Sequence, residues 1–159
     1  MDSVGESKQR NLSLYVTQRN ISNPPVAGPS KIDVLFRETV LEPDAVCVNH
    51  CSIDFAGFPA PTGLYFVNCS LLGPSGEVML ASKRQPILLA INGGANPSGV
   101  MSEYHFADLV NDISKKSDEV LPGIQFWFTD IDGTPVRFDT ARTFCLSIMF
   151  LYKRKILNK

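Results

Sequence analysis

Apolar and polar residues alternate with a period of two in the last third of this chain. One predicted strand covers residues 124–129 and a second covers residues 143–152, each with a single face of apolar side chains: Ile124, Phe126 and Phe128 on the first, and Phe144, Leu146, Ile148 and Phe150 on the second. This alternation is typical of half-buried antiparallel strands. Between them, Asp132, Gly133 and Pro135 predict a turn in which Gly133 adopts φ > 0.

Five further apolar runs predict strands, and one segment predicts a helix. The runs are bounded by Gly, Pro, Asn and Asp, and they cover residues 12–17, 31–36, 45–55, 64–72 and 86–91. The helix is expected near residues 103–116, because four apolar residues recur there at helical spacing: Phe106, Leu109, Val110 and Ile113. The fold class that follows is all-β, a single antiparallel β-sandwich with one short helix.

Composition divides the chain into three parts. With 159 residues, it has the length of one domain that can bury its own core. Residues 1–30 are polar and contain the breaker-rich segment 23–30, so we expect a flexible N-terminal arm and a Pro-rich hinge that order against a neighbouring subunit. Residues 31–152 form the β-sandwich domain, and residues 153–159 form a basic, solvated C-terminal tail.

Charge and hydropathy argue against two classes of partner. The formal net charge is −1 and the basic residues are scattered, whereas nucleic-acid binding usually requires a basic face or stripe. The N-terminus has no apolar signal region, and no run of eighteen apolar residues could span a bilayer. We therefore expect a soluble protein that is made in the cytosol and contacts neither nucleic acid nor membrane.

The residues that usually carry catalysis lack partners in the sequence. His50 and His105 are the only histidines, and neither has a persuasive set of neighbours for general-base work. All four cysteines lie in predicted strands, where burial makes a thiol inert: Cys47, Cys51, Cys69 and Cys145. We expect no enzyme, catalytic residue, metal or cofactor, and a Cys/His hydrolase is the third choice of function.

Two loops resemble ligand motifs and depart from them. Asp130-Ile-Asp-Gly begins like a calcium loop but lacks the third acidic residue and the later Glu, so Asp132 and Gly133 are interpreted as turn residues. Asn92-Gly-Gly follows a strand, yet neither glycine-rich phosphate-binding motif is present.

Aromatic residues away from the core face predict association. Trp127 lies between Phe126 and Phe128 and so must lie on the opposite face of its strand. Because several strands are apolar on both faces, we expect a homo-oligomer, a trimer or a pentamer. The candidate interface residues are Trp127, Tyr15, Phe58 and Tyr152.

Taken together, the order of these segments resembles a family of β-rich proteins encoded by Polinton/Maverick elements and adintovirus-like DNA viruses. The resemblance covers about residues 31–152, and its most specific piece is the strand, turn and returning strand around Asp-Ile-Asp-Gly-Thr-Pro-Val-Arg-Phe138. Weaker pieces lie in residues 32–35, 41–55, 64–72, 85–89, 104–105 and 146–150. The resemblance implies a virion structural protein with a jelly-roll-like fold and no catalytic residues.

The expected function is that of a non-enzymatic capsid or capsid-associated protein in a minor, vertex, cement or spike-like role. Its partners would be copies of itself and other capsid proteins, and it would be located in the virion after synthesis in the host cytoplasm, with assembly there or in the nucleus. The alternative is an attachment module that binds a receptor or glycan through loops 56–63, 73–85 and 92–101.

Overall fold

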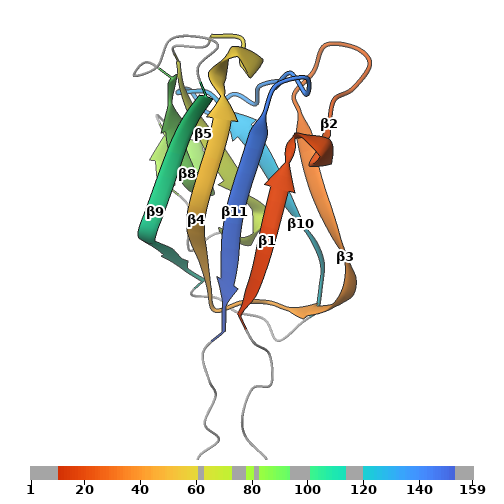
Figure 1. The fold of residues 1–159 in the computed structure, drawn as a ribbon, viewed down its shortest axis with the longest axis vertical. Helices are drawn as coiled ribbons and strands as arrows, with labels where there is room; N and C mark the ends of the chain where they lie inside the picture. Colours follow the sequence, from red (N-terminus) through yellow and green to blue (C-terminus); the bar gives the residue numbers. More distant parts are fainter. Residues whose placement is uncertain are drawn as a thin grey trace, which may run out of the picture.

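Two antiparallel sheets face each other across an apolar core (Figure 1). This computed structural model describes residues 11–60, 63–72, 78–80, 83–93, 101–113 and 120–152. The four-stranded sheet has the order β1 (Leu12–Thr17), β11 (Phe144–Leu151), β4 (Ala45–Asp54) and β9 (Met101–Asp112). The five-stranded sheet has the order β2 (Ile21–Ser22), β3 (Lys31–Leu41), β10 (Val120–Thr129), β5 (Leu64–Cys69) and β8 (Ile87–Asn92).

Shorter elements complete the described chain. β6 (Val78–Leu80) and β7 (Lys83–Gln85) pair with each other as a separate two-stranded sheet. Three single-turn 3₁₀ helices follow strands: η1 (Gln18–Asn20), η2 (Phe55–Gly57) and η3 (Ser70–Leu72). The predicted all-β sandwich is therefore confirmed.

The period-two pattern places the predicted core residues inside. All four apolar residues on the predicted inner face of β11 are buried, as are Ile124, Phe126 and Phe128 of β10. Aromatic rings meet between the sheets, where the Phe128 ring lies edge-on to Phe58 and Phe144 with centroids 5.2 and 5.1 Å apart. Such edge-to-face pairs add to the free energy gained from apolar burial.

The predicted helix is wrong, because residues 101–112 form strand β9. This strand pairs with β4 from Ala45↔Asp112 to Asp54↔Met101, with one irregularity between Val48 and His50. Pairing with β4 satisfies the backbone of both strands, and this long-range gain outweighs the helical spacing of the apolar residues. The remainder of the predicted helix, beyond Ile113, lies outside the described residues.

The predicted flexible arm is wrong for residues 12–22, which form β1, η1 and β2, whereas the breaker-rich segment 23–30 connects β2 to β3 without a strand. β1 pairs with β11 from Leu12↔Phe150 to Thr17↔Cys145, and β2 pairs with the start of β3. Val16 and Ile21 belong to the buried core, so these strands contribute to both sheets of the sandwich. Residues 1–10 and the predicted basic tail, 153–159, lie outside the described residues.

The two C-terminal strands lie in different sheets. β10 is the middle strand of the five-stranded sheet, whereas β11 lies between β1 and β4. The chain therefore crosses from one sheet to the other between Thr129 and Phe144, and it buries Phe138 on the way. This crossing connection supplies part of the site described next.

Candidate functional site

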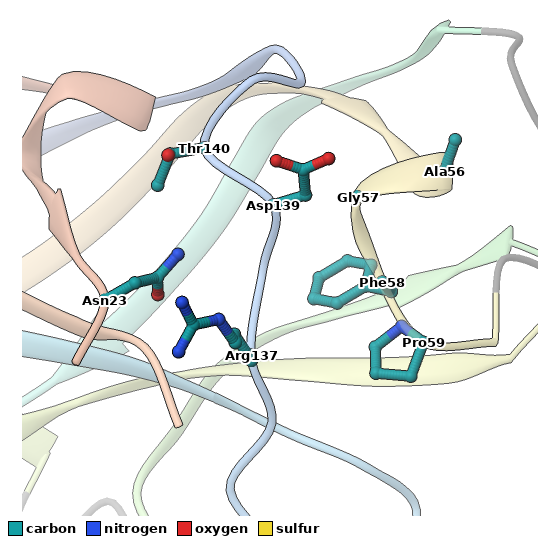
Figure 2. Close-up of a pocket in the computed structure, with 8 residues that line it drawn as sticks. All are labelled: Asn23, Ala56, Gly57, Phe58, Pro59, Arg137, Asp139 and Thr140. Carbon is teal, nitrogen blue, oxygen red and sulfur yellow. The ribbon is translucent and has the colours of Figure 1, made fainter. Parts of the chain in front are cut away.

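A pocket of about 480 Å³ lies at the end of the sandwich where β4 ends and β11 begins (Figure 2). Three segments that are far apart in the sequence form it: the β2–β3 connection, the segment around η2 and the β10–β11 connection. The lining residues are Asn23, Ala56, Gly57, Phe58, Pro59, Arg137, Asp139 and Thr140. Its volume falls within the range of about 300–1,000 Å³ that is usual for small-molecule sites.

Hydrogen bonds tie the β2–β3 connection to the β10–β11 connection. Asn23 Nδ2 donates to the carbonyl oxygen of Phe138 at 2.8 Å, and Asn23 Oδ1 accepts a short hydrogen bond from the hydroxyl of Ser30. The same hydroxyl oxygen accepts from the backbone N–H of Phe138 at 2.8 Å. Both Asn23 and Ser30 are therefore engaged in holding the wall of the pocket.

Arg137 is fixed at its tip. Its Nη1 donates to the carbonyl oxygen of Pro24 at 2.8 Å, and Figure 2 shows the guanidinium directed toward Asn23. An arginine carries five N–H donors. Among the residues that the structure describes, Pro24 is the partner of only one of them, so the other donors remain for a ligand.

Asp139 is held by its backbone and exposes its carboxylate. The backbone N–H of Asp139 donates to the Gly57 carbonyl at 2.8 Å, which joins the η2 segment to the crossing connection. Its Oδ1 accepts from the backbone N–H of Ala141 at 3.0 Å, and its carbonyl accepts from Arg142 N at 2.9 Å. Since a carboxylate has about four lone-pair sites, most of its accepting capacity is open to solvent.

The floor of the pocket is aromatic and rigid. Phe58 is only 3% exposed, stacks on Tyr65 with centroids 4.0 Å apart and lies edge-on to Phe138 at 5.1 Å. Gly57 approaches the Phe138 ring so closely that an added Cβ would lie 2.4 Å from the ring atom Cε2. Glycine is therefore required here by the close approach of a side chain.

An ion pair flanks the site. Asp54 caps η2, because its Oδ1 accepts from Ala56 N at 3.0 Å. Its other oxygen, Oδ2, lies 3.6 Å from Nη1 of Arg142. With the Arg142 side chain 48% exposed, this pair contributes little to stability.

The predicted turn has the expected glycine, and a residue outside the predicted three stabilises it. Gly133 adopts φ +77°, as predicted. The residue that stabilises the turn is Asp130, whose Oδ1 accepts from the backbone N–H groups of Asp132 at 2.9 Å and Thr134 at 3.0 Å. Asp132 is exposed, and Pro135 forms an isolated bridge with Thr129.

The four candidate interface residues have different surroundings. Tyr15 is 67% exposed on β1. Trp127 is partly buried on the face of β10 opposite Phe126 and Phe128, where it borders a second, smaller pocket of about 210 Å³. The prediction for Phe58 is wrong, because its ring fills the core and is not available to another subunit.

Tyr152 follows β11 and is tied to the chain itself. Its hydroxyl donates to the carbonyl of Leu41 at 2.6 Å, and its backbone N–H donates to Asn11 Oδ1 at 3.2 Å. Burial and the nearby charge of Asp44 raise the pKa of Tyr152 to about 12. Its hydroxyl therefore stays protonated and bonded to Leu41 at neutral pH.

The cysteines and His50 lie in strands, away from the pocket. Burial raises the pKa of Cys51 and of Cys69 to about 12, with a smaller contribution from Cys145 in the case of Cys51. Both thiols are therefore protonated at neutral pH and poor nucleophiles. His50 Nε2 lies 3.0 Å from Ser52 Oγ on β4, and its register partner on β9 is His105.

The pocket residues were not all visible in the sequence. Segment 56–63 was expected as a recognition loop, but no sequence pattern selected Asn23, Arg137 or Thr140. Of the other two predicted recognition loops, 73–85 includes β6 and β7, and 92–101 lies mostly outside the described residues.

Comparison with known proteins adds no relatives. A scan against models of known protein families found no match, and a search of curated proteins found no similar sequence. In the part of the chain that the structure describes, no group of three or more His, Cys, Asp and Glu residues is placed to hold a metal ion. Nor does any described helix have the length and hydropathy needed to cross a membrane.

Proposed function

We propose that this chain is a non-enzymatic virion structural protein with a jelly-roll fold, acting through self-assembly and contacts with other capsid proteins. The observation that carries the proposal is the strand order. Without the short strands β2, β6 and β7, eight principal strands remain, and we number them 1 to 8 along the chain. In these numbers the order β1-β11-β4-β9 reads 1-8-3-6, and the order β3-β10-β5-β8 reads 2-7-4-5. This nested order matches that of the eight-stranded double-sheet jelly roll, which recurs in viral capsid and lectin domains, and so supports the proposed fold.

A fold alone does not assign a function, so the interior and the surfaces matter as well. The interior between the sheets is filled by aromatic and aliphatic side chains, which favours a role for the outer faces and loops. The resemblance of residues 31–152 to virion proteins of Polinton/Maverick elements and adintovirus-like viruses supports the capsid role. Synthesis in the host cytoplasm and incorporation into the virion follow from the same proposal.

Exposed apolar side chains on β1 and β3 support self-assembly. Tyr15 of β1 is 67% exposed and Leu35 of β3 is 78% exposed. β1 is the edge strand of its sheet, β3 is next to the short edge strand β2, and the two strands lie on the same side of the sandwich (Figure 1). Among the described strands, β2 covers the outer edge of β3 only at Lys31 and Ile32. Exposed edges and apolar side chains of this kind are typical of surfaces that pair with another chain.

Negative-stain electron microscopy of the purified protein tests the proposal. We expect closed rings with threefold or fivefold symmetry, and we expect Leu35→Asp to abolish them. Val26→Asp is the matched control, because Val26 is equally exposed but lies in the loop between β2 and β3. Particles of single-chain size from the unmodified protein would contradict the proposal, as would equal effects of both variants.

A second candidate function, attachment to a receptor, is favoured by the pocket at the loop end. Rigid scaffolds commonly present recognition residues on loops. Binding of fluorescent protein to cultured cells, compared with binding of an Arg137→Gln variant of equal thermal stability, tests this function. If the unmodified protein does not bind to cells, the attachment function is excluded.

A further inference from the structure

We infer that the pocket at the loop end binds a neutral, hydroxyl-rich saccharide, through Asp139, Arg137 and Thr140. This inference deepens the second candidate function and rests on it, not on the assembly proposal. It starts from the charges in the pocket. One guanidinium and one carboxylate line the same space, so their charges balance.

The balance of charges selects the kind of ligand. The carboxylate of Asp139 would repel a phosphate or sulfate, and the guanidinium of Arg137 would repel a cation. A hydroxyl group both donates and accepts, so neighbouring hydroxyls on one ring can donate to the carboxylate and accept from the guanidinium. Thr140, which is exposed beside them, adds a group that does both.

The remaining walls suit the apolar face of a sugar ring. Pro59 is exposed and Ala56 is partly exposed, and both line the pocket. The ring of Phe58 lies beneath them and is nearly buried, so it supports the wall without offering its own face for stacking. A small apolar surface beside a few fixed polar groups is the usual composition of a small-molecule site.

The polar groups are already held in place before any ligand arrives. Pro24 fixes the tip of Arg137, and the Gly57 carbonyl and Ala141 N–H fix the backbone and one oxygen of Asp139. Binding therefore requires little ordering of loops, and this lowers its entropic cost.

A glycan array with separate neutral, sialylated and sulfated arms tests the inference, followed by titration calorimetry with the best neutral saccharide. We expect the neutral arm to bind. Asp139→Asn should lower the affinity at least about tenfold, because the amide loses the charge-assisted hydrogen bonds to hydroxyls. Asp132→Asn is the matched control, since it removes an exposed carboxylate from the same β10–β11 connection outside the pocket, and it should leave the affinity unchanged.

Each other outcome overturns the inference in a distinguishable way. Binding confined to the sialylated or sulfated arm would refute the neutral ligand, and equal affinities of the two Asn variants would place the site elsewhere. If the array shows no binding but cells treated with glycosidases still bind the protein, attachment stands and the saccharide inference fails. If neither the array nor the cells bind, both the inference and the second function fail.

Discussion

The substitution Gly57→Ala probes the wall shared by the pocket and the core. An added Cβ would lie 2.4, 2.6 and 2.9 Å from three atoms of the Phe138 ring, distances that real contacts do not reach. The ring is fully buried and cannot turn away, because Phe58, Phe128 and Phe144 surround it with centroids 5.1–6.0 Å apart. Overpacking of this kind costs about 1–3 kcal/mol, which corresponds to a fall in Tm of roughly 2–12 °C for a domain of this size.

Urea denaturation measures the effect, with the single tryptophan, Trp127, as the fluorescent probe. The control is the same substitution in a Phe138→Leu background, where the smaller side chain removes the clash. We expect the double variant to be more stable than the sum of the single effects predicts, by about 1–2 kcal/mol of coupling energy. A Gly57→Ala protein whose stability is unchanged within about 0.5 kcal/mol, or additive effects in the double variant, would refute this packing.

Three further predictions concern the turn, the N-terminus and the buried thiols. Gly133→Val should lower the free energy of unfolding by about 1–3 kcal/mol in urea denaturation, because it forces a β-branched residue to positive φ. Asp132→Asn should leave the stability nearly unchanged, because Asp132 is exposed. A larger effect of Asp132→Asn than of Gly133→Val would disprove the turn assignment. Deleting residues 1–17 removes β1, which pairs with β11 from Leu12 to Thr17, and should unfold the protein, as circular dichroism would reveal. Burial raises the pKa of Cys69 to about 12, whereas the thiol of the unfolded chain loses its proton near pH 9. The contribution of Cys69 to the free energy of unfolding is therefore complete below pH 9, and above pH 9 it falls by about 1.4 kcal/mol per pH unit. In urea denaturation at a series of alkaline pH values, a Cys69→Ala variant should lose this part of the pH dependence of stability.

The strands were predictable where one face is buried and the other is not. β10 and β11 alternate cleanly, so their core faces could be assigned from the sequence. β9 was not predictable, because its apolar spacing also fits a helix and only the pairing with β4 decides between the two. β1 was predicted as a strand, but its place in the sandwich was not, because its polar neighbours suggested an arm and its partner, β11, lies more than a hundred residues away.

The candidate site was less predictable than the fold. Asn23 and Arg137 meet because the β2–β3 and β10–β11 connections reach the same end of the sandwich. No local motif marks either residue, since the function of each depends on hydrogen bonds to a segment more than a hundred residues away in the sequence. Asp130 was missed for a different reason: its importance comes from accepting two turn N–H groups, whereas the sequence drew attention to the adjacent Asp132 and Gly133.

The proposed assembly of this sandwich with copies of itself is tested by the mass of the protein in solution. Light scattering behind size-exclusion chromatography, over a series of concentrations, gives that mass without assumptions about shape. We expect three or five times the 17.5 kDa of one chain, unchanged on dilution through the micromolar range. A mass of 17.5 kDa at tens of micromolar would contradict it.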